Sequence, residues 1–150
     1  MIFLRVVLLI SMGVPLAFLA GCGTATTGAG AAEGTSVSTR IEFDSRYDID
    51  RAVVTVFQSE GFQLASRRAD GFTFQQVGTP ATQAVYGDWF AAGVLVRTEV
   101  IITNPEFGTH LVRCEVFLLE RGAGEWIPAR EGNAQFKGLL KKVKKLAGVL

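Results

Sequence analysis

Few residues in this chain of 150 could do covalent chemistry: one histidine, His110, and two cysteines, Cys22 and Cys114. A Ser-His-Asp hydrolase could use the histidine, but the sequence has no Gly-x-Ser-x-Gly turn to present a nucleophile. We therefore interpret His110 as a strand-end residue. Cys114 shares one face of a predicted strand with Val112 and Val116, so we expect a buried, unreactive thiol.

Metal ligands are equally sparse. One histidine and two dispersed cysteines leave no zinc-ligand cluster. Asp44, Asp48 and Asp50 suggest calcium only superficially, because their spacing departs from the calcium-loop pattern and Arg46 lies among them. We interpret these aspartates as capping residues of a helix. The sequence thus predicts no metal, no dissociable cofactor and no enzyme, with a hydrolase that uses carboxylates alone as the remaining enzymatic alternative.

Cys22 closes an N-terminal segment of the kind that directs export. Arg5 precedes an apolar run over residues 6–20, which is too short and too interrupted to suit a membrane span. Leu19-Ala20-Gly21 then places one aliphatic and two small residues before the cysteine, so that a peptidase can reach the backbone. These four residues together resemble the lipobox of bacterial lipoproteins.

The lipobox resemblance implies a signal peptide over residues 1–21, cleavage between Gly21 and Cys22, and acylation of Cys22 with fatty chains such as palmitate. An ordinary cleaved signal peptide is the alternative. Gly23, where an aspartate would favour the inner membrane, favours the outer membrane with the body facing the periplasm. The implied partner is therefore the membrane, contacted through the covalent lipid.

The amino-acid composition also changes at Cys22. The whole chain is 49% hydrophobic with net charge +1, and removal of Arg5 leaves equal numbers of basic and acidic residues. This balance gives no reason to expect nucleic acid as a partner. Residues 22–38 are small and polar and predict a tether with a reach of roughly 20–25 Å. Residues 39–150 remain as one domain of ordinary size.

The domain opens with a predicted strand and helix. Alternation over residues 39–43 predicts a strand with Ile41 and Phe43 pointing inward. Helical spacing of apolar residues predicts a helix over 49–60, which Gly61 is placed to end.

A hairpin is predicted next, from strands over residues 62–68 and 72–77. A three-residue loop over 69–71 suits a type I turn with a left-handed glycine. This register pairs Ser66 with Phe74 and Leu64 with Gln76. It also gives the hairpin one apolar face, formed by Phe62, Leu64, Phe72 and Phe74.

Residues 78–93 predict a loop, with a short strand or helical turn near Trp89. The clearest hairpin follows, from 94–103 and 109–120, with Thr103 paired to Thr109 across a five-residue loop. Charges then pair on one side and β-branched residues on the other: Arg97 with Glu115, Glu99 with Arg113, Val96 with Val116, and Val100 with Val112.

A final amphipathic helix is predicted over residues 133–150. Its apolar stripe is formed by Phe136, Leu139, Leu140, Val143, Leu146 and Leu150. Its lysines lie mostly off that stripe and form a possible basic surface for anionic groups: Lys137, Lys141, Lys142, Lys144 and Lys145. A solvated helix face is the alternative. The order β-α-β-β-β-β-α predicts an α+β fold, with a single antiparallel sheet and two helices packed on one face.

Four aromatic residues fall in predicted loops and could rim a binding surface or cap an open end of the core: Tyr86, Trp89, Phe90 and Trp126. Residues 57–72, with a helix ending at Gly-aromatic and a charged turn between strands, are similar to segments of small α+β envelope lipoproteins. This resemblance implies an interaction or assembly module with a protein partner in the envelope. The alternative is a binder of small ligands or lipids, with a pocket between helices and sheet.

Overall fold

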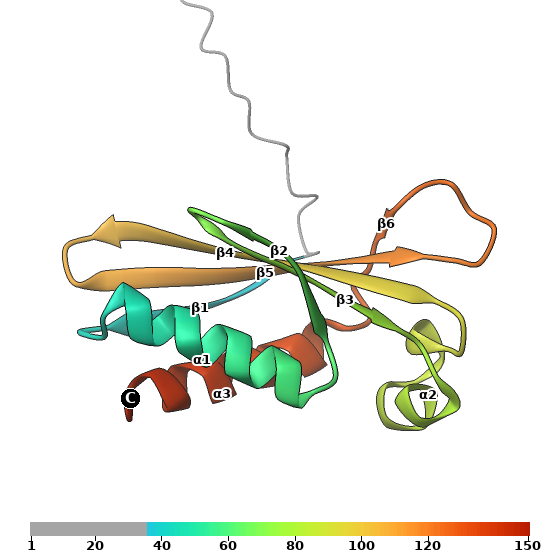
Figure 1. Cartoon of the computed structure of the whole chain (residues 1–150), viewed down its shortest axis with the longest axis horizontal. Helices are drawn as coiled ribbons and strands as arrows, with labels where there is room; N and C mark the ends of the chain where they lie inside the picture. Colours follow the sequence, from blue (N-terminus) through green and yellow to red (C-terminus); the bar gives the residue numbers. More distant parts are fainter. Residues whose placement is uncertain (1–35) are drawn as a thin grey trace, which may run out of the picture.

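The computed structural model describes residues 36–150, which form an antiparallel sheet with helices (Figure 1). The strands are β1 Ser36–Glu42, β2 Gln63–Arg68, β3 Gly71–Val77, β4 Leu95–Glu106, β5 Thr109–Leu119 and β6 Ile127–Pro128. The helices are α1 Arg46–Ser59, α2 Pro80–Tyr86, the 3-10 turn η1 Asp88–Phe90 and α3 Asn133–Ala147. Within this part of the chain, no helix is long and apolar enough to span a membrane.

The sheet has the order β1-β5-β4-β3-β2, and β6 pairs with β5 beyond the end of β1. The connection through α1 therefore carries the chain from one edge of the sheet to the other. Helices α1 and α3 lie side by side against one face (Figure 1). This arrangement confirms the predicted α+β class, with both amphipathic helices on the same face of one antiparallel sheet.

Aromatic side chains fill the space between the helices and the sheet. Phe57 of α1 stacks on Phe74 of β3 with ring centroids 4.7 Å apart, and Phe62 and Phe136 complete the cluster. The valines of β4 and β5 that were predicted to point inward are buried, and so is Cys114. Period-two alternation therefore assigned the inner face of these strands correctly.

The N-terminal boundary of the fold lies earlier than predicted. β1 begins at Ser36, inside the predicted tether, and pairs with β5 along its whole length. The predicted signal peptide, residues 1–21, and Cys22 lie outside the described residues.

Helix α1 begins at Arg46, because the Ser45 hydroxyl accepts a hydrogen bond from the Asp48 N–H at 3.1 Å. Phe43 was predicted to point inward like Ile41, and that prediction is wrong. Its side chain is 92% exposed and its φ is +68°. The strand ends at Glu42, and the left-handed backbone that follows turns Phe43 away from the core.

The β2–β3 hairpin has a two-residue loop, because Arg68 pairs with Gly71, so the predicted three-residue loop is wrong. A Cβ on Gly71 would lie 1.9 Å from the Val100 carbonyl oxygen. Glycine is needed here for close strand contact, and not for a left-handed turn. A bulge then shifts the register, which places Leu64 opposite Phe74 and Ser66 opposite Thr73, and leaves Leu64 39% exposed.

The β4–β5 hairpin is also tighter than predicted. Glu106 pairs with Thr109 across the loop Phe107–Gly108, and Thr103 pairs with Leu111 instead of Thr109. A bulge between Thr103 and Glu106 absorbs the difference.

This change of register moves every predicted partner by two residues. Side chains keep their face and lose their partner, because the side-chain period of a strand is two. The observed pairs are Arg97 with Phe117, Glu99 with Glu115, Val96 with Leu118, and Val100 with Cys114.

Residues 78–93 contain more structure than the predicted loop. Thr79 caps α2 through a capping box with Thr82, and Pro80 occupies the first turn. The helical turn predicted near Trp89 is present as η1.

Candidate interaction surface

One face of the sheet is not covered by α1 or α3, and we call it the open face (Figure 1). It is formed by the outward side chains of the two longest strands, β4 and β5, none of which is fully buried. They are Leu95, Arg97, Glu99, Ile101, Leu111, Arg113, Glu115, Phe117 and Leu119. The face is thus charged at its centre and apolar towards β6.

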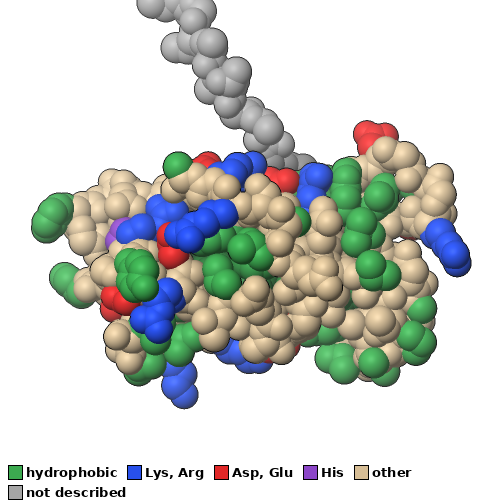
Figure 2. Space-filling view, in the orientation of Figure 1, with side chains coloured by type: hydrophobic (Ala, Val, Ile, Leu, Met, Phe, Trp, Pro, Cys, Tyr) green, Lys and Arg blue, Asp and Glu red, His purple; other side chains and the backbone are tan. Residues whose placement is uncertain are grey.

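An arginine between two aromatic rings marks the apolar part of the open face. The Arg97 guanidinium carbon lies 4.4 Å from the centroid of the Trp126 ring and 5.0 Å from that of Phe117. Pairing of Pro128 with Phe117 holds this loop against β5, and Ile127 is 52% exposed. Figure 2 shows hydrophobic side chains gathered near this end of the sheet. Tryptophan and arginine are the residue types that dominate binding energy in protein interfaces.

The charged part of the open face contains an unfavourable pair. Glu99 lies directly opposite Glu115, a like-charge pair that destabilises a sheet. Each glutamate is offset by an arginine two residues before it in its own strand: Arg97 lies 3.3 Å from Glu99, and Arg113 lies 3.3 Å from Glu115. Arg68 of β2 approaches Glu99 from the other side, at 3.7 Å. The face thus displays fixed charges of both signs.

The four predicted loop aromatics do not form one surface. Tyr86, Trp89 and Phe90 pack on one another and, through Trp89, on Phe136, so they close one end of the core. Trp126 alone joins the open face. The core-capping interpretation is therefore confirmed for Tyr86, Trp89 and Phe90, and a binding role for Trp126 stays a prediction.

Glu60 connects this aromatic end to the helices. Its carboxylate accepts a hydrogen bond from the Tyr86 hydroxyl at 3.1 Å, and its other oxygen lies 2.6 Å from the Lys142 amine. Burial, and then the negative charge and hydrogen bond of Glu60, raise the pKa of Tyr86 above its usual value of 10.0.

The lysines of α3 lie where the sequence placed them. Phe136, Leu139, Leu140 and Val143 face the core, and the five lysines are exposed. The helix ends at Ala147, so Leu150 is not part of the apolar stripe and is 47% exposed.

Of the residues with chemically reactive side chains, His110 and Cys114 are both buried. His110 is 7% exposed, and its Nδ1 lies 2.8 Å from the amide oxygen of Asn104. The partner of His110 is therefore an amide, whereas the histidine of a Ser-His-Asp site pairs with a carboxylate. Cys114 is fully buried, and burial raises the pKa of its thiol well above the usual range. The expectation of an inert cysteine agrees with this environment.

The side chain that caps α1 is that of Ser45, so the interpretation of Asp44 and Asp50 as capping residues is wrong. Asp48 lies in the first turn beside the Ser45 cap, and Asp50 forms ion pairs with Arg46 at 2.7 Å and Arg67 at 3.2 Å. Among residues 36–150, no group of three or more histidine, cysteine or acidic side chains is arranged to hold a metal ion.

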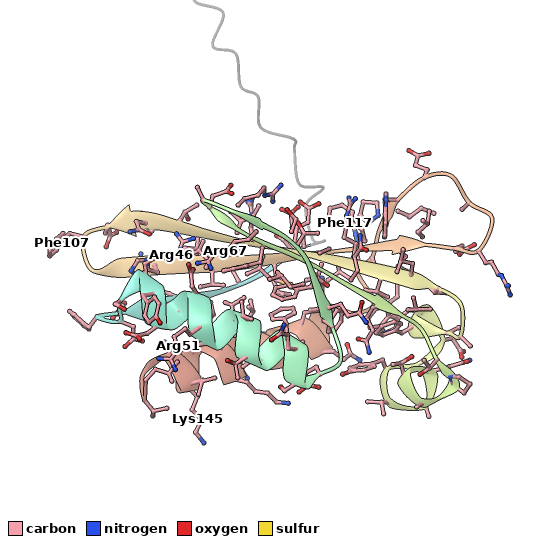
Figure 3. All side chains as sticks on the ribbon, viewed as in Figure 1. Arg46, Arg51, Arg67, Phe107, Phe117 and Lys145 are labelled. Carbon is pink, nitrogen blue, oxygen red and sulfur yellow. The ribbon has the colours of Figure 1, made fainter. Side chains whose placement is uncertain are left out.

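An open groove of about 300 Å³ lies between α1 and the β2–β3 hairpin. It is lined by Tyr47, Asp50, Arg51, Val54, Thr55, Arg67 and Phe72. Arg51 of α1 and Arg67 of β2, both labelled in Figure 3, supply basic side chains to this lining. The lining is mixed: Tyr47, Val54 and Phe72 give it apolar surface, and Asp50 pairs with Arg67.

Comparison with known proteins adds little to these observations. No protein-family model matches the chain, and no curated protein matches it. Among solved structures, it is similar to one titled as the adenylate sensor from AMP-activated protein kinase in complex with 5-aminoimidazole-4-carboxamide 1-β-D-ribofuranotide. The identity is 13% and the TM-score is 0.45, over 70% of this chain and 93% of that chain. A likeness of this extent indicates neither a shared fold nor a shared ligand.

Proposed function

We propose that this chain is a lipid-anchored lipoprotein of the bacterial envelope that acts as a non-enzymatic interaction or assembly module. Acylated Cys22 anchors it to a membrane, for which we propose the outer membrane facing the periplasm. The open face of the sheet binds a protein partner. The lipobox over residues 19–22 supports the anchoring.

The observation that carries the proposed binding role is the stacking of Arg97 between Trp126 and Phe117. Such a cluster offers a large, rigid contact area with a fixed charge at its centre, which suits a protein interface. The flanking ion pairs at Glu99 and Glu115 give the surface a charge pattern that a complementary partner can match.

A photo-crosslinking amino acid at position 117, in intact cells, tests this role directly. The matched control is position 58, because Gln58 is exposed on the helical side of the molecule. A protein adduct of defined mass from position 117, absent from position 58, supports the proposal. Equal adducts from both positions, or none from position 117 while position 58 reacts, would contradict it.

The groove between α1 and the β2–β3 hairpin favours a second candidate, a binder of small ligands or lipids. Its volume of about 300 Å³ is at the lower end of the range for ligand pockets. Native mass spectrometry of the purified protein distinguishes the two functions. A small molecule that co-purifies, and is lost in a Val54→Arg variant that fills the groove, would favour ligand binding.

A further inference from the structure

Two phenylalanines protrude at one end of the molecule. Phe107, at the β4–β5 turn, is fully exposed, and Phe43, in the β1–α1 connection, is 92% exposed. The Phe43 N–H donates a hydrogen bond to the Gly108 carbonyl at 2.9 Å, so the two loops are held together. We call these two residues the aromatic tip. Figure 3 shows Phe107 at the extreme end of the hairpin.

The backbone at Phe43 is arranged to hold this ring outside. A bulky residue with a φ of +68° is a conformational outlier, and such strain persists only where the surrounding structure imposes it. If the Phe43 side chain pointed inward, it would extend the buried face of β1, as the alternation with Ile41 predicts. The structure instead keeps the large apolar side chain of Phe43 in water, at the same end of the molecule as the exposed Phe107.

Other exposed apolar side chains gather at the same end. Tyr47, in the first turn of α1, is 67% exposed, and Val149, after α3, is 74% exposed. The end of α3 lies beside the β1–α1 connection, because a Cβ on Gly148 would be 3.9 Å from the Asp44 carboxylate. The β4–β5 turn, the start of α1 and the end of α3 are together at one end in Figure 1.

A row of lysines leads along α3 to this end. Lys137, Lys141 and Lys145 are spaced four residues apart, so they stack on one side of the helix, and we call them the lysine row. Like charges at this spacing destabilise a helix, and α3 has no acidic residue to offset them. Of the α3 lysines, Lys142 is the one that forms an ion pair within residues 36–150. An anionic surface outside the molecule would remove this repulsion.

Two of the four acidic side chains near the aromatic tip have partners. Glu106 lies 3.5 Å from Arg40, and Asp48 accepts a hydrogen bond from the cap residue Ser45. Glu42 and Asp44 are the remaining acidic side chains beside Phe43. The cationic excess thus lies on the lysine row, and the apolar protrusion lies at its end. This combination is typical of proteins that rest on a membrane interface.

We propose that the aromatic tip inserts into the interface of the bilayer to which Cys22 anchors the chain, while the lysine row faces anionic headgroups. This inference rests on the anchoring proposed above. The fourteen residues from Cys22 to Ser36 could span about 46–50 Å when extended. The tip lies only one seven-residue strand, about 23 Å, from Ser36, so the tether is long enough.

The test uses the acylated full chain in proteoliposomes, with a Phe107→Cys variant carrying an environment-sensitive fluorophore. Val85→Cys is the matched control, because Val85 is 72% exposed on α2, away from the tip. Labelling is selective, since Cys114 is buried and Cys22 is acylated. We expect a blue shift and quenching by bromine-labelled acyl chains at position 107, consistent with a depth of about 5–10 Å. Position 85 should show neither effect.

Anionic lipid should increase quenching at position 107, and Lys141→Gln with Lys145→Gln should remove that increase. A Phe43→Ser change should reduce quenching at position 107 without changing the melting temperature, because Phe43 contacts water. Equal, solvent-like emission at positions 107 and 85 would overturn the proposal. So would shielding of position 107 in native membranes but not in pure lipid vesicles, because that result assigns the tip to a protein partner.

The acylation of Cys22 can be tested separately from the insertion of the aromatic tip. The intact mass of the same preparation reports whether Cys22 is acylated. If it is not, each cysteine variant is made again with Cys22→Ser, so that labelling stays selective, and the labelled protein is added to preformed vesicles. Quenching at position 107 then still supports tip insertion, and its absence overturns it.

Discussion

The contact between Arg97 and Trp126 leads to a quantitative prediction. The side chain of Arg97 is 26% exposed, and its guanidinium carbon lies 4.4 Å from the ring centroid. Cation–π contacts contribute about 0.5–1 kcal/mol at exposed sites and about 2 kcal/mol when desolvated. For this half-buried pair we expect a coupling of about 1 kcal/mol to the free energy of unfolding.

A double-mutant cycle of Arg97→Gln and Trp126→Leu measures this coupling. Urea unfolding is followed by far-ultraviolet circular dichroism, on the chain that begins at residue 22 with Cys22→Ser. A coupling of 1 kcal/mol corresponds to about 0.3–1 M in the urea midpoint. The loss of the ion pair between Arg97 and Glu99 enters both arms of the cycle and cancels.

Arg113 supplies the matched control for this cycle. It forms the same kind of ion pair along its strand, 3.3 Å from Glu115, but has no cation–π contact with Trp126. Arg113→Gln should therefore show no coupling with Trp126→Leu beyond about 0.3 kcal/mol. If the two arginines couple equally to Trp126, or if Arg97 does not couple at all, the assignment of Arg97 as a stacked anchor is refuted.

Three further predictions concern the body of the protein. Gly138→Ala should raise the free energy of unfolding by up to about 1 kcal/mol, because a Cβ at this position meets open space. Gly71→Ala should lower the free energy of unfolding sharply, because its Cβ would clash with the Val100 carbonyl. Urea unfolding measures both changes. The fold raises the pKa of Tyr86, so this residue contributes stability below pH 10 that is lost as the pH rises through its folded pKa. Tyr86→Phe should remove that part of the alkaline loss of stability, as measured by urea unfolding at a series of pH values. An unchanged alkaline profile would contradict this prediction. Cys114 should resist thiol reagents until the protein unfolds, and rapid labelling of native protein would show that its burial is wrong.

The sequence predicted which face each residue occupies better than it predicted which residue lies opposite. Arg97 and Glu99 point outward as expected, because alternation is a local property of the strand. Their partners depend on the length of the turn and on a bulge between Thr103 and Glu106. Alternation along a strand specifies neither the length of a turn nor the position of a bulge.

At the candidate interaction surface, too, the sequence predicted the kind of residue better than its contacts. Trp126 was recognised as a loop aromatic, but its contact with Arg97 depends on the two-residue strand β6, which is too short to have a periodic signal. Helix α2 had a signal that the prediction did not use. Thr79 followed by Pro80 is an N-cap before a first-turn proline, and Thr82 completes the capping box.

The intact mass of protein extracted from membranes tests the central claim, lipid anchoring of this module, most directly. We expect a chain that begins at Cys22 and carries a thioether-linked diacylglycerol and an amide-linked acyl chain. We also expect that Cys22→Ala abolishes both the cleavage and the added mass. An unmodified Cys22 in the extracted protein, or a Cys22→Ala variant processed like the wild type, would show that the chain is not anchored by lipid at Cys22.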